Sequence, residues 1–434
     1  MAEKTAVIIG AGVLGCSIAY ALAKAGYRVI DIDKLPAPGY GSTSSSCAIV
    51  RFTYSTLPTV SLAYEGYHYW KDWAGFLGAG TEEDLSRYLE TGHLVLRTSA
   101  DDRRETIELY RQLGISYEEW SLDQIRERLP LLDLHRLGPP VSLDDPAFYS
   151  EQQATLEGGV YLPQGGYVTD PQLAARNLYD AARRAGATFM FNREVASIDR
   201  RGGRVCGVTL VSGEVIEADI VVNVAGPHSA IINRMAGVEE DMSVRTRALR
   251  REVHHVPAPQ GFDPITDMPV MSDPDAGVYL RPETGRTISI GSTDPVCDEK
   301  TWVDDPDTVD RNITDVFWKT QVYRFARRMP TLPIPNQGKG VVDMYDVSDD
   351  WTPIYDRSSL PGFYMAIGTS GHQFKNAGVV GVLMATLIDA CEAGLDHDAR
   401  PLSITGTYTG LPIDLGAFSR LRDLNSKSSF SVRG

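Results

Sequence analysis

The sequence has few of the features that tie a protein to an oxidising compartment or to a membrane. Its 434 residues include only five cysteines, scattered without a C-x-x-C pair, which predicts reduced thiols and a cytoplasmic location. The longest apolar run, at 377–388, is shorter than a bilayer span requires, so we expect a buried helix there and no membrane span. The chain leads directly into an apolar strand pattern, and no signal peptide is expected.

Positive charge is also in short supply. Lysine and arginine total 42 against 57 aspartates and glutamates, a net charge of −15, which disfavours nucleic acid or an anionic membrane as a partner. An anionic substrate would need a local cationic site within this negative field. The arginines at the start of one strand pattern, Arg245, Arg247, Arg250 and Arg251, are predicted to form a solvated strand end or loop. No set of His, Cys, Asp or Glu has zinc spacing, so no metal is expected.

The amino-terminal segment carries the strongest pattern. Residues 5–9 predict a buried strand, G-A-G-V-L-G follows at 10–15, and an apolar helix pattern continues to residue 26. In such a turn Gly10 allows the tight bend, Gly12 lets backbone N–H groups approach a pyrophosphate, and Gly15 lets the helix pack on the strand. The helix N-terminus then presents unpaired donors to the phosphates. The segment therefore predicts a dinucleotide site.

The rest of the chain returns to this α/β pattern twice. The second strand, at 28–32, ends in Asp33, whose carboxylate can bind ribose hydroxyls. Residues 160–226 predict a helix that begins at Asp170, a hairpin at 204–217 and a buried strand at 219–225. A further return follows at 341–390. Between these segments, residues 60–135 are predicted to be mainly helical and residues 245–330 to form a sheet-rich domain.

The order of these segments resembles that of the D-amino-acid-oxidase superfamily of flavoproteins, and of its sarcosine oxidase-like branch in particular. Three features carry the resemblance: the dinucleotide opening, the strand that ends in V-A-G-P at 224–227, and the late return at 361–375. The resemblance implies an α/β fold with a Rossmann-like FAD-binding domain built from residues 1–58, 150–232 and 335–400. It also implies an α+β substrate domain with an antiparallel sheet at 59–149 and 233–334, and a C-terminal tail at 401–434.

The late segment, PGFYMAIGTSGHQFK at 361–375, is similar to the family's strand, glycine turn and flavin-facing helix start. A helix that begins after Gly371 would direct its positive end at a reduced flavin. The resemblance implies that Lys375 holds the substrate carboxylate and that His372 lies beside the cofactor. By residue type alone, Lys375 could equally be a solvated surface lysine.

The serine-rich loop at 41–47 resembles the family's flavin-contacting loop, and Arg51 falls where an arginine pairs with the substrate carboxylate. An arginine can bind a carboxylate through two parallel hydrogen bonds. Arg51 and Lys375 are far apart in the sequence, so a shared role requires the fold to bring them together. Their presence at both matching positions favours an amino acid over a neutral amine as substrate.

The V-D-M-Y segment at 342–345 bears on how the flavin is attached. Some relatives carry a cysteine at the position of Asp343 and bond it to the flavin, and others use a histidine in the loop that here spans 41–47. Neither residue is present, so we predict non-covalent FAD. Tyr345 matches an active-site tyrosine of the sarcosine oxidase branch, although a core tyrosine fits its pattern equally well.

Residues 279–291 resemble the family's substrate-domain strands and include Tyr279. Oxidases of the sarcosine type keep a lysine near the position of Ser289 that activates oxygen. Serine at this position favours a dehydrogenase over an oxidase. The electron acceptor is left as either O₂ or a redox partner.

The resemblance implies two sets of site residues. The catalytic set is Arg51, Lys375, Tyr345 and Tyr279. The FAD-binding set is Gly10, Gly12, Val13, Leu14, Gly15, Asp33, Lys34, Ser42, Thr43, Ser46, Cys47, Ala48, Val195, Ala225, Gly226, Gly371, His372, Gln373, Phe374 and Lys375.

The predicted function is FAD-dependent oxidation of the C–N bond of an amino acid, N-methylated, N-alkylated or cyclic, to an imine that water hydrolyses. Two alternatives stay open. One is a flavoenzyme of the same fold that acts on a hydroxy acid or polyol. The other is a flavin-binding subunit whose partner carries the chemistry or accepts the electrons. The oligomeric state is also left open.

Overall fold

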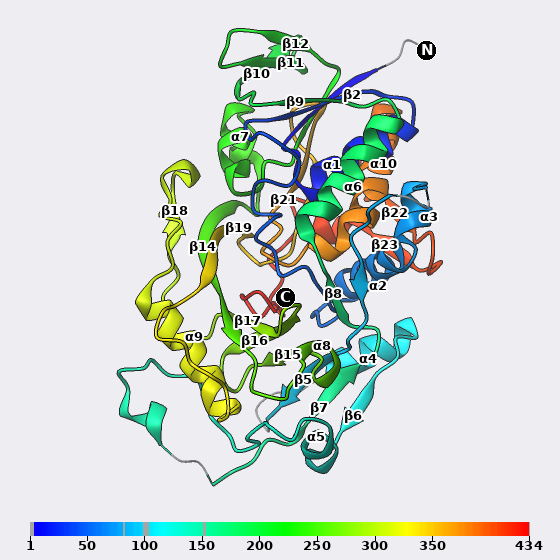
Figure 1. The fold of residues 1–434 in the computed structure, drawn as a ribbon. Coiled ribbons are helices and arrows are strands. Elements are labelled where there is room, and N and C mark those ends of the chain that lie inside the picture. The colour runs from blue at the N-terminus through cyan, green and yellow to red at the C-terminus, as the bar shows by residue number, and fades with distance from the viewer. Residues whose placement is uncertain (1–3, 81–82, 99–103, 151–152, 434) are drawn as a thin grey trace.

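Two large β-sheets organise the chain, one in the upper half of Figure 1 and one in the lower half. The computed structural model describes residues 4–80, 83–98, 104–150 and 153–433. The amino terminus lies at the top of the upper half, whereas the carboxy-terminal segment ends near the centre of this view (Figure 1).

The upper sheet has six strands and is parallel except at one edge, where β20 runs antiparallel to β21. Its strands in spatial order are β20 (Ile354–Arg357), β21 (Phe363–Ile367), β13 (Ile220–Asn223), β1 (Thr5–Ile9), β2 (Arg28–Asp33) and β9 (Thr188–Phe191). Three segments distant in the sequence supply the central strands. This confirms the predicted Rossmann-like sheet built from discontinuous segments.

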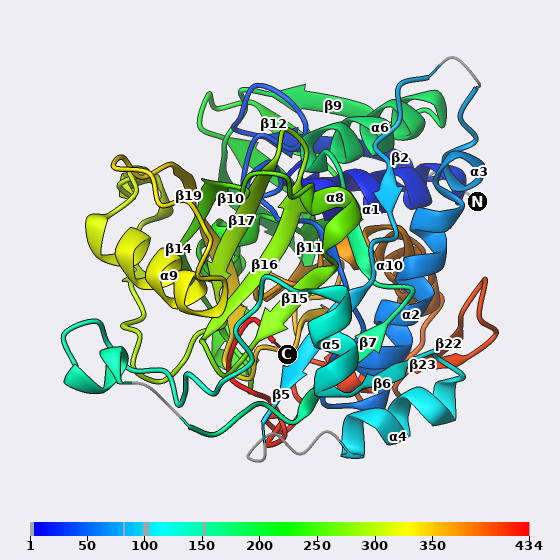
Figure 2. The same cartoon turned by 60° about the horizontal axis from the view of Figure 1, so that its bottom comes forward.

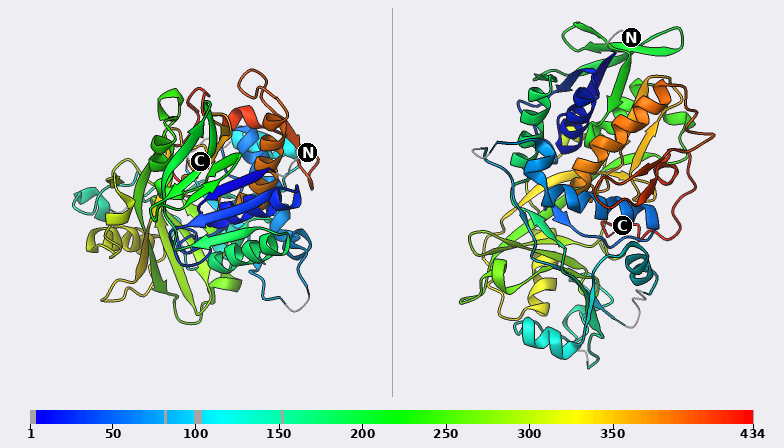
Figure 3. Two further views of the ribbon diagram at one scale, coloured as in Figure 1. Left: turned by 90° about the horizontal axis from the view of Figure 1, so that it is seen from above. Right: turned by 90° about the vertical axis from the view of Figure 1, so that its right-hand side faces the viewer.

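Side chains alternate between the faces of this sheet, as the period of a strand requires. Ala6 and Ile8 of β1 belong to one core cluster, and Val7 and Ile9 belong to another. The first cluster is covered by α1 (Val13–Lys24), α6 (Pro171–Arg184) and α10 (Ala377–Glu392), and Figure 3 shows α10 running beside α1. The second is covered by α7 (Ser229–Met235) and by the antiparallel strands β10 (Val195–Arg201), β11 (Arg204–Leu210) and β12 (Val215–Glu217). The sheet is therefore buried on both faces, as parallel sheets are.

The lower sheet has nine strands and is antiparallel except where β15 and β5 meet. Its path is β18 (Trp302–Val303), β14 (Thr246–Pro257), β17 (Thr287–Ser292), β16 (Val278–Glu283), β15 (Val270–Asp273), β5 (His93–Arg97), β7 (Gly158–Leu162) and β6 (Glu118–Trp120), with β19 (Gly340–Ser348) also paired to β14. Figure 2 brings this sheet forward and shows α9 (Asp315–Arg328) beside it. Trp318, Val322 and Phe325 recur at helical spacing on α9 and pack into the core of this sheet.

Shorter elements connect and flank the two sheets. The helices are α2 (Leu57–Lys71), α3 (Trp73–Leu77), α4 (Arg104–Leu113), α5 (Leu122–Arg128) and α8 (Pro264–Asp267). The remaining strands are β3 (Ile49–Val50), β4 (Tyr88–Leu89), β8 (Gly166–Val168), β22 (Ser403–Thr405) and β23 (Pro412–Asp414). The 3₁₀ turns are η1 (Pro146–Tyr149), η2 (Gly226–His228), η3 (Glu239–Asp241), η4 (Pro306–Thr308), η5 (Phe374–Asn376) and η6 (Leu415–Phe418).

Local signals in the sequence are confirmed where side chains act on their own backbone. The Asp170 carboxylate accepts a hydrogen bond from the N–H of Leu173 and caps α6, which starts at Pro171 as expected. The hairpin predicted at 204–217 is β11–β12, with Gly213 at φ +86° in its turn.

The prediction that residues 60–135 are mainly helical is wrong in part. β4, β5 and β6 lie in this range. Leu94, Val95 and Leu96 of β5 form a short apolar run, and periodicity alone cannot tell such a run from a buried helix. The strands that pair with it, β7 and β15, come much later in the chain.

The division of the chain into domains stays a prediction. β7 falls in the range 150–232 and β19 in 335–400, which were both expected in the FAD-binding domain. Both strands nevertheless form hydrogen bonds within the nine-stranded sheet. By strand pairing, β7 and β19 therefore belong with the lower sheet and not with the six-stranded sheet.

One helix in the described part of the chain, Phe374–Glu392, is long and apolar enough to cross a membrane. Because η5 precedes α10, this helix is longer than the apolar run at 377–388, so its length does not exclude a span. In its 18-residue apolar stretch, 67% is buried inside the protein, where α10 packs on α1 and α2. We therefore interpret it as a core helix.

Candidate active site

A large pocket extends from the first turn of α1, at the edge of the upper sheet, to strands of the lower sheet. Its wall includes residues from β1, the serine-rich loop, β16, β19 and the turn before α10, together with two residues near the carboxy terminus. Every residue of the predicted catalytic and FAD-binding sets lies in this wall. The fold thus gathers residues from widely separated segments of the chain at one pocket.

The glycines of the first turn lie where no side chain fits. A Cβ on Gly15 would lie 1.8 Å from the carbonyl oxygen of Gly10, and a Cβ on Gly10 would lie 2.6 Å from that of Val224. Gly10 also has φ +113°, which favours glycine. Gly12 supplies no side-chain cap to α1, and the Thr43 hydroxyl accepts a hydrogen bond from the N–H of Val13 at 3.1 Å; the first turn of this helix lines the pocket, where its other backbone donors can meet a ligand.

The end of β2 supplies polar groups at the same end of the pocket. The Asp33 carboxylate accepts hydrogen bonds from the N–H groups of Ala11 and Leu35, each at 2.8 Å, and burial raises its pKa. Lys34 donates to Asp307, and His228 lies 2.9 Å from Lys34 Nζ and 3.1 Å from Asp307 Oδ1. Asp307 belongs to η4, so this cluster connects the dinucleotide end to the segment between β18 and β19 of the lower sheet.

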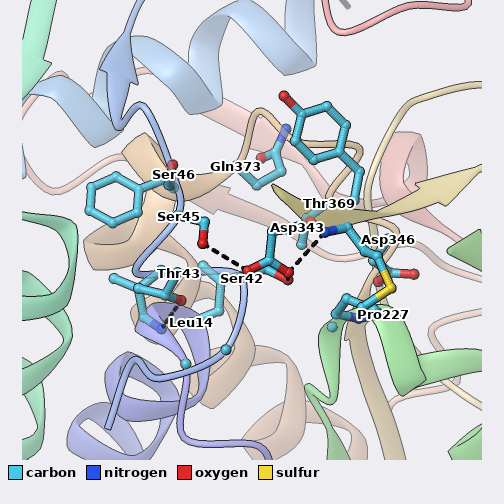
Figure 4. A pocket seen from close by; sticks show the side chains of 18 of the residues that line it. Leu14, Ser42, Thr43, Ser45, Ser46, Pro227, Asp343, Asp346, Thr369 and Gln373 are labelled. Atoms are coloured by element: carbon cyan, nitrogen blue, oxygen red, sulfur yellow. Dashed lines mark hydrogen bonds between the residues drawn. The ribbon is translucent and has the colours of Figure 1, made fainter. Parts of the chain in front are cut away.

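The serine-rich loop is held against β19 by one carboxylate. Asp343 Oδ2 accepts a hydrogen bond from the Ser45 hydroxyl at 2.8 Å, and Oδ1 accepts one from Ser42 at 3.1 Å. The Arg311 guanidinium lies 2.9 Å from Asp343. Figure 4 shows Ser45 and Asp343 pointing toward each other in the pocket wall. Asp343 thus fixes the loop at the position where some relatives carry a cysteine bonded to flavin.

The glycine turn before α10 is held by a second carboxylate. Asp346 Oδ2 accepts a hydrogen bond from the N–H of Gly368 at 2.6 Å, and burial raises the pKa of Asp346 to about 7. Gly371 has φ +73°, and a Cβ there would lie 2.4 Å from the Tyr345 ring. This short distance means that the glycine turn packs directly on Tyr345. The helix predicted after Gly371 is confirmed as η5 followed by α10.

Arg51 and Lys375 converge on one tyrosine. The Arg51 guanidinium carbon lies 4.8 Å from the ring centre of Tyr54, and Lys375 Nζ lies 5.1 Å from it. Both cations are buried, with 8% and 1% of their surface exposed. Burial and the charge of Arg51 lower the pKa of Lys375 well below its ordinary value. The solvated lysine left open by the sequence is therefore excluded.

The partners of these two cations are neutral oxygens. Lys375 Nζ donates to the Tyr54 hydroxyl at 2.6 Å and to the carbonyl of His372. Arg51 donates to the carbonyl oxygen of Thr53 at 2.7 Å, to the Thr53 hydroxyl at 3.5 Å and to the carbonyls of Val432 and Arg433. Within the described residues, neither cation has a carboxylate within ion-pair distance. Burial of a positive charge is costly without an opposite charge, so an anion bound between Arg51 and Lys375 would stabilise the charged form of both.

His372 lies beside this pair in a neutral form. Its Nε2 is 2.9 Å from the carbonyl oxygen of Trp351, and its Nδ1 is 2.8 Å from the side-chain nitrogen of Gln373. Burial, together with the charges of Lys375 and Arg51, lowers its pKa well below the ordinary value. The ring is thus a hydrogen-bonding group of the wall and not a third cation.

Two tyrosines and a thiol line the pocket beside β16 and β19. The Tyr279 hydroxyl lies 3.6 Å from Cys47 Sγ. Burial raises the pKa of Tyr279 and Cys47, and it raises that of Tyr345 to about 12. All three groups are therefore protonated at neutral pH and can donate hydrogen bonds.

The expectation that Arg250 and Arg251 are solvated is wrong, whereas Arg245 and Arg247 are exposed as expected. Arg250 is paired with Glu252 at 2.6 Å. Arg251 lies in the pocket wall with its guanidinium 5.7 Å from the Tyr345 ring centre, and it forms an ion pair with Asp294 at 2.5 Å. Its neutralising acid follows β17, more than forty residues away, so the local sequence could not reveal the pair.

The sequence patterns did not predict several other residues of the pocket wall. Asp307, Arg311 and the carboxy-terminal residues Val432 and Arg433 line the pocket without belonging to any motif. Ser289, in contrast, lies outside the wall and donates a hydrogen bond to Glu283 at 2.6 Å. Among the described residues that line the pocket, the lysines are Lys34 and Lys375.

These observations fit an FAD molecule. The glycine turn brings the first turn of α1 to the pocket, where its backbone donors can meet a pyrophosphate, and the pocket continues to a second helix start near Lys375. Gly10, Gly12 and Gly15 would hold the pyrophosphate, Asp33 the ribose, and the 371–375 turn the flavin.

Comparison with known proteins establishes the family. Residues 5–387 match the model of the DAO family, described as FAD dependent oxidoreductase. The match covers most of the chain, so the chain belongs to this family, and FAD is its cofactor.

Curated relatives include enzymes named for several amino acids. A D-amino acid dehydrogenase of Xanthobacter autotrophicus is 26% identical over 270 residues, which span 54% of this chain and 63% of that protein, less than two thirds of its length. A glycine oxidase of Geobacillus kaustophilus is 25% identical over 92% of this chain and 96% of its own. The mitochondrial sarcosine dehydrogenase of Homo sapiens is 25% identical over 86% of this chain and 38% of its own.

Solved structures show the same fold. The L-proline dehydrogenase of P. horikoshii superposes with a TM-score of 0.72 at 23% identity, covering 89% of this chain and 93% of its own. The Geobacillus kaustophilus glycine oxidase also gives 0.72, at 22% identity, and covers 98% of this chain and 100% of its own. At these identities the likeness establishes the fold alone.

The position of Asp343 predicts how firmly FAD is retained. Replacing Asp343 by alanine frees the serine loop and leaves Arg311 without its partner, so FAD should dissociate about tenfold faster or more. Ser45→Ala should give a smaller increase. Ser44→Ala is the matched control, because the exposed Ser44 hydroxyl bonds only within the loop, to the carbonyl of Gly41. The rise of free-flavin fluorescence after dilution measures these rates, and equal rates in all four proteins would contradict the role of Asp343.

Proposed function

We propose that the protein oxidises the C–N bond of an amino acid with a secondary amine, N-methylated, N-alkylated or cyclic, to an imine that water then hydrolyses. The observation that carries this proposal is the convergence of two buried cations, Arg51 and Lys375, on Tyr54 in the wall of the FAD pocket. Relatives named for glycine, sarcosine and D-amino acids support an amino-acid substrate, and sarcosine among them carries a secondary amine.

The chain's own residues bind and orient the substrate. Arg51 and Lys375 would hold its carboxylate, and Lys375 can offer one N–H beyond the two that bond Tyr54 and His372. When bound, FAD accepts a hydride equivalent from the carbon next to nitrogen. The amine must be neutral to react, and the same two cations in a buried site lower its pKa.

No side chain is proposed as a general base. Tyr279 and Tyr345 are neutral phenols, His372 is neutral and enclosed by hydrogen bonds, and the Cys47 thiol has a raised pKa. These groups would shape the pocket and donate hydrogen bonds. Among the described residues of the wall, Lys34 pairs with Asp307 and Lys375 is assigned to the carboxylate, which leaves no further lysine to activate oxygen and supports a redox partner as electron acceptor in place of O₂. A cytoplasmic location remains part of this proposal.

Anaerobic reduction of the bound flavin tests the substrate class. N-methyl and cyclic amino acids should bleach the flavin absorbance, whereas the corresponding amines without a carboxylate should not. Bleaching by hydroxy acids alone would instead favour the hydroxy-acid alternative. If no compound reduces the flavin of the isolated chain, the result would favour the alternative in which the chain is a flavin-binding subunit whose partner carries the chemistry. After admission of air, slow return of colour is expected for a dehydrogenase, and rapid return would identify an oxidase.

The lowered pKa of Lys375 predicts how carboxylate binding depends on pH. The cationic form of Lys375 binds the anion, so affinity should be lost as pH rises through its pKa, at a pH below the ordinary value for lysine. Lys375→Arg keeps its charge and should not lose affinity in that range, whereas Lys375→Met should bind at least about tenfold more weakly throughout. Acetate affinity, measured from flavin absorbance between about pH 6 and pH 10, checks this. Identical pH profiles in the lysine and arginine proteins would remove Lys375 from the anion site.

We further propose that FAD is held without a covalent bond. The candidate nucleophiles of the wall support this, because the pKa of Cys47 is raised by burial and His228 is engaged by Lys34 and Asp307. Acid precipitation should therefore release all the flavin into the supernatant. Yellow colour retained in the washed pellet would contradict the proposal.

A further inference from the structure

The segment 428–433, which we call the strap, closes the pocket beside Arg51. Val432 and Arg433 lie in the pocket wall, and only 3% of Ser431 and 8% of Val432 is exposed. The Val432 side chain packs in a small apolar cluster that includes Tyr279 and Trp351. The strap therefore lies against a tyrosine of the predicted catalytic set.

The strap also occupies the donors of Arg51. Arg51 Nη1 donates to the carbonyl oxygen of Arg433 at 2.8 Å, and Nη2 donates to that of Val432. Nη1 is shared with the carbonyl of Thr53 at 2.7 Å. Both terminal nitrogens of the guanidinium are thus engaged, and Nη1 already donates to two carbonyls. A carboxylate can bind end-on to Nη1 and Nη2 through two parallel hydrogen bonds only if a carbonyl withdraws from Nη1, and the strap supplies one of the two.

Hydrogen bonds to the backbone are among the contacts that hold the strap from outside. The N–H of Val432 donates to Asp294 at 3.2 Å, and Lys300 Nζ donates to the carbonyl of Phe430 at 3.1 Å. The strap lies outside the regular helices and strands. Phe430 has φ +47°, a left-handed conformation that is strained for a bulky side chain. The closed position therefore depends on these contacts and not on the strap's own backbone preference.

We propose, on the basis of the function above, that the substrate carboxylate displaces the strap from Arg51. A carboxylate carries the charge opposite to that of the guanidinium, so it adds a Coulomb attraction that the neutral carbonyls lack, and it can bind through two parallel hydrogen bonds. With the carbonyls of Val432 and Arg433 withdrawn, Arg51 can join Lys375 around one anion. In the closed position the strap shields the two buried cations, and Val432 limits the space beside Tyr279.

Acetate binding to the FAD-loaded enzyme tests this competition. A variant that ends at Lys427 lacks the strap and should bind acetate about tenfold more tightly, because Arg51 no longer has to release two carbonyls. Lys300→Ala removes one anchor and should tighten binding severalfold without shortening the chain. Lys427→Ala is the matched control, because Lys427 pairs with Glu105 and not with the strap, and its affinity should equal that of the wild type.

Hydrogen–deuterium exchange reports the movement directly. Acetate should speed exchange in residues 428–433 of the wild type, where the Val432 N–H loses Asp294, whereas acetamide should have no effect. Unchanged exchange at saturating acetate, or unchanged affinity in both strap variants, would overturn the strap proposal. The variant Lys300→Ala keeps this test valid should the shortened chain fail to fold.

Arg51→Met separates this proposal from the proposed function. If acetate binding depends on Arg51 but not on the strap, only the strap proposal fails. If acetate binds equally well to Arg51→Met and to the wild type, the anion site itself is wrong, and both proposals fail. Loss of acetate binding in Arg51→Met together with tighter binding in the strap variants supports both.

Discussion

The burial of two positive charges against one tyrosine ring is the constraint on which the site depends. Removing a charge from water is costly unless an opposite charge accompanies it. Arg251 meets this requirement through Asp294, and Arg328, fully buried in the lower half, meets it through Asp273 and Asp275. Arg51 and Lys375 do not, since their partners within the described residues are carbonyls, a phenol and the Thr53 hydroxyl. In a chain with a net charge of −15, these two basic side chains are the basis of the proposed anion site.

Two carboxylates support this site from behind. Asp343 holds the serine-rich loop, and Asp346 holds the turn that begins at Gly368. Both belong to β19, which also carries Tyr345, and β19 pairs with β14 in the lower sheet. One strand thus connects the cofactor loop, the glycine turn and the pocket tyrosine. Displacement of this strand would disturb cofactor binding and substrate binding together.

The strap adds a second way to satisfy Arg51. Its carbonyls compensate part of the cost of the buried guanidinium while the anion site is closed. A substrate carboxylate would compensate that cost more fully, because it brings the opposite charge. The cost of burying the Arg51 charge would therefore favour an anion in the site and, when no anion is bound, the strap carbonyls in its place.

Local patterns in the sequence predicted much of the fold. The first strand, its glycine turn and the Asp170 cap follow from backbone sterics and from side chains that bond within a few residues, and the structure confirms them. The resemblance predicted which segments line the pocket, and all the residues of its catalytic and FAD-binding sets lie in the pocket wall, whereas Ser289 does not. Strand β5 was missed because a short apolar run has no period of its own and its partners lie far along the chain.

The sequence by itself determined the dinucleotide turn, since only glycine fits where backbone atoms approach within van der Waals contact. The tertiary structure decided what each charge does. Arg250 and Arg251 look like surface arginines in the sequence, yet Glu252 and Asp294 neutralise them in the interior. Arg51 meets the carbonyls of Val432 and Arg433 only because the end of the chain returns to the pocket. Electrostatic energy depends on distance and burial in space, and neither is written in the order of the residues.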